Sequence, residues 1–285
     1  MAAVQDEGVR SPLRGLERVT IAGIARRVLG SDTAELGDWR VEVVEASMGA
    51  ATGGVYRVAG NAMCGGAKAS WSVILKVVSA GAPGGHNDFR DEAHPLYWKR
   101  EALAYASGLL DDLPGGIRAP RCYDVVEVDG DTVWLWLEEV QDEHAEGWSL
   151  EQYARAAECL GRFNGAYLAG RPLPAHWWLV KTGSPRGLLD HNAWLRDVMA
   201  DPVTWQHPLL RAAFPVPVVD RLLQLWDERE LLLRALDRGP QTFCHLDAWR
   251  GNMFAPVSGG GLHGLTLIDW AYPGLGAAGT DPGDL

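Results

Sequence analysis

The sequence predicts an α+β fold with two lobes, a β-rich N-terminal lobe over residues 1–140 and a mainly helical C-terminal lobe over residues 141–285. Three observations lead to this expectation. Short β-type runs dominate the first half, stretches with helical periodicity dominate the second, and an acidic segment over 138–147 separates them. With 285 residues, of which 47% are hydrophobic, the chain is long enough to build a sizeable core.

The N-terminal lobe begins with a loose tail over 1–15 and a helix over 16–29 that stops at Gly30. Two strands are expected next, over 41–44 and 55–58, and the turn between them is rich in small residues and glycine. Such a turn lets backbone N–H groups approach phosphate oxygens, because glycine has no Cβ in the way. The turn lacks the Walker pattern, and taken alone its Gly53-Gly54 pair is better explained by an ordinary hairpin turn.

A lysine stands inside the next apolar strand, over 71–78. Lysines are rarely buried without a partner, so Lys76 either extends from a sheet edge to solvent or pairs with a buried anion. The helix expected over 95–105, after a flexible loop at 81–85, carries Glu101 near its middle. Taken alone, Glu101 reads as a solvated helix residue, but with the C-terminal motif described below an ion pair with Lys76 is the favoured interpretation.

A hairpin completes the lobe, with strands over 121–128 and 132–137 and a type I′ turn at Asp129-Gly130. The acidic segment after it contains Glu139 and Val140, and reads either as a linker whose backbone binds a nucleobase or as a plain polar connector.

Helical periodicity begins beyond the linker, over 150–168, 192–199 and 218–236. Pro217 marks the start of the last helix. Its expected buried face consists of Val218, Leu222, Leu225, Leu231, Leu232 and Leu236.

The most informative motif lies near the C-terminus and has the spacing H-x-D-x-x-x-x-N. It comprises His245, Asp247 and Asn252, and Asp269 follows at the end of a short apolar strand over 265–268. In kinase-type phosphoryl transfer one Asp accepts the substrate hydroxyl's proton, and an Asn and a second Asp hold Mg²⁺. The motif therefore predicts a phosphotransferase.

Other interpretations of these residues stay open. His245 could be a satisfied core histidine, Asp247 a turn former and Asn252 a cap. A metal-dependent hydrolase using His245, Asp247 and Asp269 would need further ligands at metal spacing, and the remaining histidines form no such cluster. A third alternative is a kinase-like protein that binds nucleotide without catalysis.

Together these residues resemble the aminoglycoside phosphotransferase superfamily, the small-molecule branch of the protein-kinase-like fold. The resemblance covers the chain from about residue 40 to its end. The matching positions are Gly49, Val55–Val58, Lys76, Glu101, Leu135–Val140, Leu160–Asn164, His245, Asp247, Asn252 and Ile268–Trp270.

The resemblance implies an ATP-dependent kinase that moves the γ-phosphoryl group to a hydroxyl of a small molecule, such as an aminoglycoside, amino sugar or amino alcohol. It assigns Asp247 as the base and His245 as a brace of its loop. ATP would be bound by Lys76 with Glu101 behind it, by the turn residues Gly49, Thr52 and Gly53, and by Glu139 and Val140 of the linker. Mg²⁺ would be held by Asn252 and Asp269.

The chain departs from the family pattern in three places. Leu246 stands where many members have Gly, and Trp249 where His or Lys is frequent, so that only the adjacent Arg250 could supply a cation there. The family also continues into further helices where this chain stops at Leu285, so we expect a C-terminal lobe that is incomplete at that end.

Composition points to a cytoplasmic protein that binds a small molecule. A net charge of −11 argues against nucleic acid or an anionic membrane as the partner, and it suits a cationic acceptor or simple solubility. No apolar run reaches the length of a membrane span. Free thiols are expected because no C-x-x-C spacing occurs among Cys64, Cys122, Cys159 and Cys244.

Overall fold

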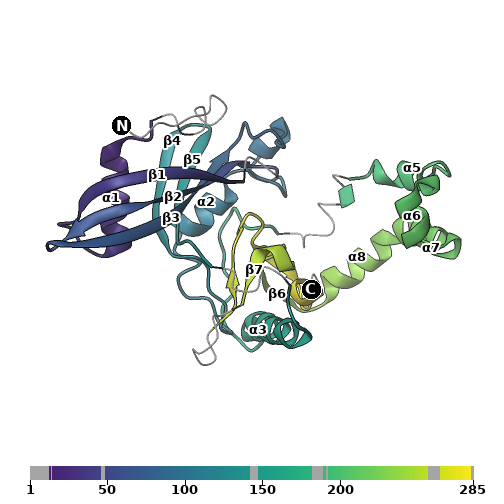
Figure 1. The fold of residues 1–285 in the computed structure, drawn as a ribbon. Helices are drawn as coiled ribbons and strands as arrows, with labels where there is room; N and C mark the ends of the chain where they lie inside the picture. Colours follow the sequence, from purple (N-terminus) through teal and green to yellow (C-terminus); the bar gives the residue numbers. More distant parts are fainter. Residues whose placement is uncertain are drawn as a thin grey trace.

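The computed structural model describes residues 13, 15–45, 49–141, 147–181, 189–190, 192–255 and 264–283. A β-rich lobe and a mainly helical lobe are visible in Figure 1, so the predicted α+β, two-lobed fold is confirmed. Most of the expected N-terminal tail, parts of the glycine-containing turn and of the linker, and the last two residues lie outside the described residues.

The β-rich lobe is built on a five-stranded antiparallel sheet with the order β1-β2-β3-β5-β4. Its first strands run further than the apolar runs predicted, because backbone pairing between β2 and β3 continues through polar residues up to Cys64 and Ala67. The hairpin at Asp129-Gly130 is confirmed, but its predicted type I′ turn is not, because none of Asp129, Gly130 and Asp131 has the left-handed φ that this turn requires. The strands are β1 (Glu35–Glu45), β2 (Thr52–Cys64), β3 (Ala67–Ser79), β4 (Cys122–Asp129) and β5 (Thr132–Leu137).

Two helices cover opposite faces of this sheet, since alternate side chains of a strand point to opposite sides. Helix α1 (Arg18–Leu29) packs with Trp134 and Trp136 of β5 and ends at Gly30, as predicted, where φ is 61°. Helix α2 (Arg100–Ala106), preceded by the 3₁₀ turn η1 (Asn87–Arg90), packs with Leu135 and its neighbours. The face under α2 is therefore the one that meets the second lobe.

The first helix of the second lobe is α3 (Leu150–Leu168), which has the bounds predicted for it, and Ser149 and Gln152 form a reciprocal cap at its start. Phe163 of this helix packs edge-on against Phe243 and Trp270. The rest of the second lobe beside α3 consists of short strands, a 3₁₀ turn and a short helix. They are β6 (Gln241–Cys244), η3 (Arg250–Asn252), β7 (Met253–Phe254), β8 (Thr266–Leu267), β9 (Gly274–Ala277) and α9 (Thr280–Gly283).

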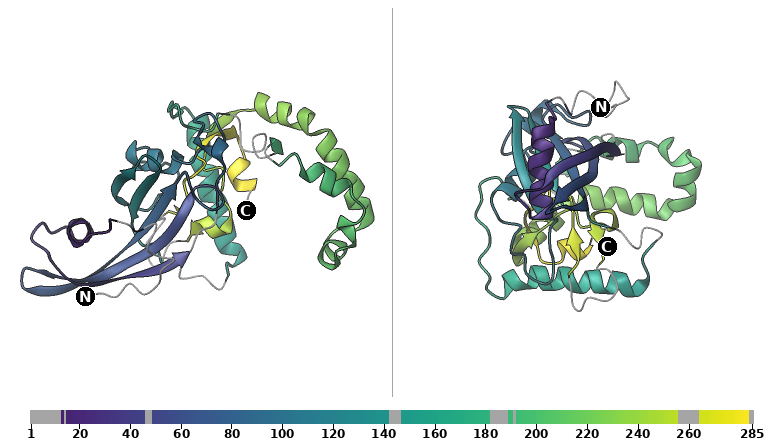
Figure 2. Two further views of the ribbon diagram at one scale, coloured as in Figure 1. Left: turned by 90° about the horizontal axis from the view of Figure 1, so that it is seen from above. Right: turned by 60° about the vertical axis from the view of Figure 1, so that its left-hand side comes forward.

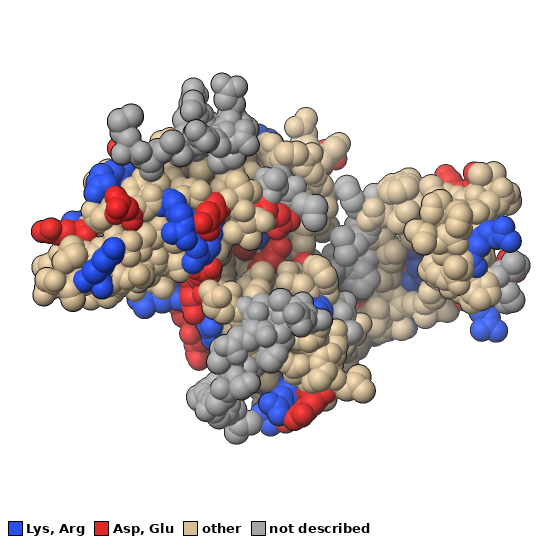
Figure 3. Space-filling model, viewed as in Figure 1, with Lys and Arg blue, Asp and Glu red and all other residues tan. Residues whose placement is uncertain are grey.

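The remaining helices form an arm that extends away from both lobes in Figure 1 and in the left view of Figure 2, and α8 joins it to the second lobe. Uncharged side chains cover much of the face of the arm seen in Figure 3, whereas acidic and basic side chains are interspersed on the β-rich lobe. The arm comprises α5 (Leu195–Ala200), η2 (Thr204–Gln206), α6 (Pro208–Ala213), α7 (Val216–Asp227) and α8 (Arg229–Arg238).

Two predictions for this arm are wrong. The single helix expected over 218–236 is broken at Glu228, where φ is −90° and ψ is 0°. Its expected buried face is largely exposed, with Leu225 at 52% and Leu231 at 71%, and the buried leucine is Leu233. Periodicity reports that a helix is amphipathic, but it does not report whether another element covers the apolar stripe.

All four cysteines are free thiols, as predicted. Within the described residues no helix is long and apolar enough to cross a membrane.

Candidate active site

A buried lysine between two carboxylates forms the centre of the site. Lys76 Nζ lies 2.7 Å from Glu101 Oε2 and 2.7 Å from Asp269 Oδ1. Strand β3 carries Lys76 to the sheet face under α2, and both Lys76 and Glu101 are less than one-tenth exposed. Glu101 lies in the first turn of α2, not mid-helix as expected, because the chain before Arg100 forms turns instead of helix. The ion pair that the sequence favoured is therefore present.

The three charges determine one another's protonation. Burial raises the pKa of Glu101 to about 7, against the opposing charge of Lys76. Burial acts to lower the pKa of Lys76, but the neighbouring carboxylates outweigh it and raise that pKa above its usual value. Burial acts to raise the pKa of Asp269, but the ammonium of Lys76 holds it below its usual range. Lys76 and Asp269 are thus ionised near neutral pH, and Glu101 titrates close to it.

The predicted catalytic loop places Asp247 against Asn252. The Asn252 amide nitrogen donates to Asp247 Oδ2 at 2.8 Å and to the Asp247 carbonyl at 3.0 Å. These two hydrogen bonds orient the side-chain amide of Asn252. The side-chain oxygen, Oδ1, is then the atom that can bind a cation. Ile268 N–H donates to the main-chain carbonyl of Asn252 at 3.0 Å, which places the residue before Asp269 beside Asn252.

These contacts allow the fit of a divalent cation to be judged. Asn252 and Asp269 come from adjacent strand ends, because β7 and β8 pair at Met253 and Leu267. Each residue offers an oxygen, the donor that Mg²⁺ prefers. Asp269 adopts a left-handed backbone with φ of 59°, and its side chain is 36% exposed. The two residues therefore fit the predicted Mg²⁺ site.

His245 is completely buried and uses both ring nitrogens inside the protein. Its Nε2 donates to the Ile268 carbonyl at 2.9 Å, and Nδ1 accepts from the Asp247 N–H at 3.3 Å. Burial lowers the pKa of the imidazole, so the neutral tautomer protonated on Nε2 is the form present. This ring joins the Asp247 loop to the strand that delivers Asp269, an arrangement that suits a brace and not a group in contact with substrate.

Sequence reasoning gave Asp281 no role, yet this carboxylate holds the same loop from the other side. Oδ2 accepts from the His245 N–H at 3.0 Å, and Oδ1 accepts from the Leu246 N–H at 2.9 Å. The Asn164 amide donates to it at 3.1 Å from α3. Asp281 is fully buried, and no periodicity or spacing distinguishes it from the exposed acidic residues of the chain.

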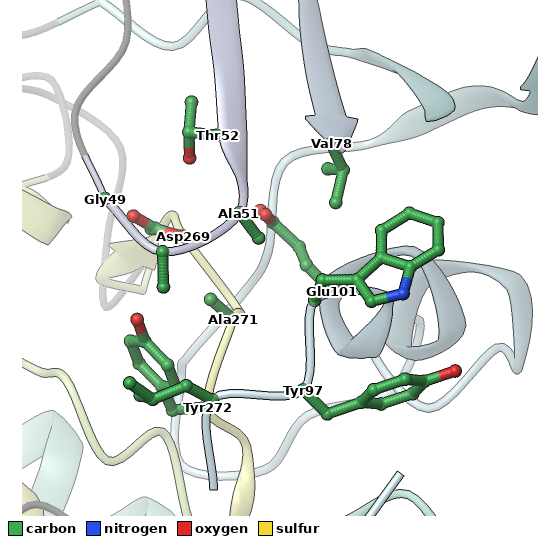
Figure 4. A pocket seen from close by; sticks show the side chains of 12 residues that line it. Gly49, Ala51, Thr52, Val78, Tyr97, Glu101, Asp269, Ala271 and Tyr272 are labelled. Atoms are coloured by element: carbon green, nitrogen blue, oxygen red, sulfur yellow. The ribbon is translucent and has the colours of Figure 1, made fainter. Parts of the chain in front are cut away.

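A small pocket lies between the glycine-containing turn, the start of α2 and the segment after Asp269 (Figure 4). Gly49 and Thr52 line it together with Glu101 and Asp269, so four predicted site residues meet here. Tyr272 also lines the pocket and was missed from the sequence. Burial and the nearby carboxylates of Asp269 and Asp247 raise the pKa of its phenol to about 12, which keeps the hydroxyl protonated as a donor.

Other predicted residues lie outside this cluster. Gly53 lies in β2, and a Cβ added to it would lie 3.3 Å from Val77 Cγ1. Glu139 follows β5, and its side chain accepts from Arg57 of β2 at 2.7 Å. Val140 is the next residue of the chain and is half-buried.

Arg250 is the residue beside Trp249 that could supply a cation to the loop, and it contacts Trp148 and Met253. The guanidinium lies 4.4 Å from the ring centroid of Trp148 and donates to the Met253 carbonyl at 2.9 Å. Trp249 is 54% exposed, and its indole covers Gly251.

A hydrolase with metal-binding clusters also finds no support, because the described residues contain no group of three His, Cys, Asp or Glu placed to hold a metal.

The fold and the Lys76–Glu101–Asp269 cluster beside an H-x-D loop define a kinase-like protein. The sequence matches the model of the phosphotransferase enzyme family, APH, over residues 71–285. The chain belongs to this family, which confirms the resemblance noted from its motifs. No curated protein sequence matches the chain.

Solved structures with a similar fold carry the names of aminoglycoside phosphotransferases. A crystal structure of aminoglycoside-3′-phosphotransferase of type VIII has a TM-score of 0.50 and 15% identity, covering 98% of this chain and 83% of that one. APH(3″)-Id from Streptomyces rimosus, in complex with ADP and streptomycin, has a TM-score of 0.46 and 18% identity, with coverages of 94% and 81%. At these identities the likeness of the first structure establishes the fold alone.

Proposed function

We propose that this protein is an ATP-dependent phosphotransferase that moves the γ-phosphoryl group to a hydroxyl of a small molecule. The observation that carries the proposal is that the Asp247–Asn252 pair lies beside the cluster of Lys76, Glu101 and Asp269. The hydrogen bond from Ile268 N–H to the Asn252 main-chain carbonyl joins the two groups. Membership of a phosphotransferase family supports the same reaction class.

ATP would bind under the turn at 49–53, where Lys76 would contact its phosphates and Glu101 would hold the lysine in place. Asp247 accepts the proton of the acceptor hydroxyl as that oxygen bonds to the γ-phosphorus and the bond to ADP breaks. Asn252 fixes the orientation of the Asp247 carboxylate through the 2.8 Å hydrogen bond. Mg²⁺, when bound, neutralises charge on the triphosphate, and Asn252 and Asp269 supply its protein oxygens.

The acceptor class is the finer part of the proposal. The similar structures are named for aminoglycoside substrates, and an excess of acidic residues, with a net charge of −11, suits a polycationic acceptor. Amino sugars and amino alcohols have the same combination of a hydroxyl and a cationic amine.

Four free thiols suit a reducing compartment, and we place the protein in the cytoplasm.

The test is consumption of ATP in the presence of Mg²⁺ with a panel of aminoglycosides, sugars, amino alcohols and nucleosides. We expect consumption that depends on one acceptor class and falls about 10²- to 10⁴-fold in Asp247→Ala. The control is Asp227→Asn, which alters an exposed ion pair with Arg196 on the distant arm and should retain activity.

Two results would change this assignment. Near wild-type turnover in Asp247→Ala would remove Asp247 as the base. No consumption with any acceptor, combined with a higher melting temperature in Mg·ATP, would favour the kinase-like protein that binds nucleotide without transferring phosphate.

A further inference from the structure

Arg100, the first residue of α2, is a buried cation for which the described residues provide no carboxylate ligand. Its side chain is almost fully enclosed, and its hydrogen bonds all go to main-chain carbonyl oxygens. Burial lowers the pKa of the guanidinium to about 10, so the group is still charged at neutral pH. Placing a charge in such surroundings is costly, and the three hydrogen bonds to carbonyl oxygens are what offset that cost here.

The three carbonyls belong to two separate parts of the chain. Two NH groups donate to Pro95 at 2.6 Å and to His94 at 2.9 Å, in the turn that leads into α2. Nε donates at 2.7 Å to the carbonyl of Trp178, which lies in the second lobe, after α3. One planar guanidinium therefore fixes the start of α2 to the other lobe, as its fork of donors permits.

The residues that follow Trp178 pair through backbone hydrogen bonds with the segment that follows Asp269. Val180 N–H donates to the Pro273 carbonyl at 3.2 Å, and Leu275 N–H donates back to the Val180 carbonyl at 2.8 Å. The approach is so close that a Cβ on Gly274 would lie 2.4 Å from the Val180 carbonyl oxygen. The contact is thus backbone against backbone and leaves little freedom for either segment.

Glu101 is the residue after Arg100, and Asp269 precedes the segment paired with Val180. The same guanidinium thereby connects the two elements that carry the partners of Lys76. We propose that Arg100 is a positioning residue that fixes α2 relative to the 273–275 segment, and so sets the placement of Glu101 and Asp269 around Lys76. Its catalytic consequence rests on the proposed phosphotransferase function, but the structural coupling does not.

The experiment uses the full chain with two variants. Arg100→Met removes every donor, and Arg100→Lys keeps the positive charge but cannot donate to all three carbonyls in the planar geometry of the guanidinium. Amide hydrogen exchange is followed by mass spectrometry on peptides covering 100–106, 178–180 and 273–277. We expect Arg100→Met to accelerate exchange about tenfold in all three regions, with a smaller effect for Arg100→Lys. The control is Arg26→Met on α1, whose Nε also donates to a carbonyl, that of Ala34 at 3.1 Å.

Unchanged exchange in 273–277, even with faster exchange in α2, would overturn the proposal, because Arg100 would then be a local anchor only. Arg100→Lys retains a cation and provides the same readout if Arg100→Met fails to fold. In the active enzyme we expect KM for ATP to rise about tenfold at an unchanged folded fraction, since a mere loss of stability would reduce only the active fraction. If the wild type transfers no phosphate, hydrogen exchange still decides the coupling.

Discussion

Lys76 Nζ lies 2.7 Å from Asp269 Oδ1 although 193 positions separate the two residues. Glu101, the second partner of the lysine, comes from the first lobe, whereas Asp269 comes from the second. The ammonium therefore has one carboxylate from each lobe. The position of this single charge depends on how both lobes pack, which makes the cluster a sensitive probe of the assembled site.

Lys76→Met should destabilise the protein, because it leaves two carboxylates near each other without the cation between them. Removing one partner of a buried pair costs about 3 kcal/mol of unfolding free energy. Urea denaturation measures the effect, and Lys76→Met combined with Glu101→Leu should cost less than the sum of the single changes. Lys99→Met is the matched control, since its ion pair with Glu127 is exposed and should contribute at most about 1 kcal/mol. Additive single and double variants would contradict the coupling.

Leu246→Gly should be no less stable than Leu246→Ala, in reverse of the usual order. Leu246 has a φ of 65°, a conformation that costs a residue with a Cβ about 1 kcal/mol or more and costs glycine little. Both variants lose the buried contacts of the leucine with Val180 and Tyr272, about 2–5 kcal/mol for such a truncation. Thermal unfolding of the two variants provides the comparison. An alanine variant that is clearly the more stable one would show that the backbone relaxes at this position.

His245→Gln should weaken the dependence of stability on acidic pH. Burial lowers the folded-state pKa of His245, so below the ordinary value of 6.5 the unfolded chain binds a proton that the folded chain does not. Stability is therefore lost as pH falls from 6.5 toward the lowered pKa, with a slope of at most about 1.4 kcal/mol per pH unit. Glutamine keeps an N–H donor and an oxygen acceptor but cannot titrate. Denaturant melts of both proteins between pH 4.5 and 7.5 would reveal the difference, and parallel curves would argue against it.

Asp281→Asn should loosen the catalytic loop even though Asp281 is not expected to touch substrate. The change removes a charge that accepts from the His245 and Leu246 N–H groups, and hydrogen bonds to a charged group contribute about 1.5–3 kcal/mol each. We expect lower unfolding free energy and a lower kcat, with acceptor KM little changed. Asp227→Asn, at an exposed position, is the matched control for the loss of one carboxylate.

Local patterns predicted much of the β-rich lobe correctly. The Asp129-Gly130 hairpin and the Gly30 stop appear where they were expected, because both depend on the conformational preferences of a few adjacent residues, although the hairpin turn is not of type I′. The helix at 218–236 was misjudged, because its apolar stripe depends on a packing partner for burial and the arm provides little of one.

The sequence by itself determined the family, the two-lobed fold and the identity of Lys76, Asp247, Asn252 and Asp269 as candidate site residues, because fixed loop spacing and a lone lysine in an apolar strand are local features. Only the tertiary structure decided that Lys76 has two carboxylate partners, that Asp281 holds the loop, and that Arg250 turns toward Trp148. The reason is physical. Distances between side chains from different lobes depend on how those lobes pack, and no periodicity along the chain encodes that packing.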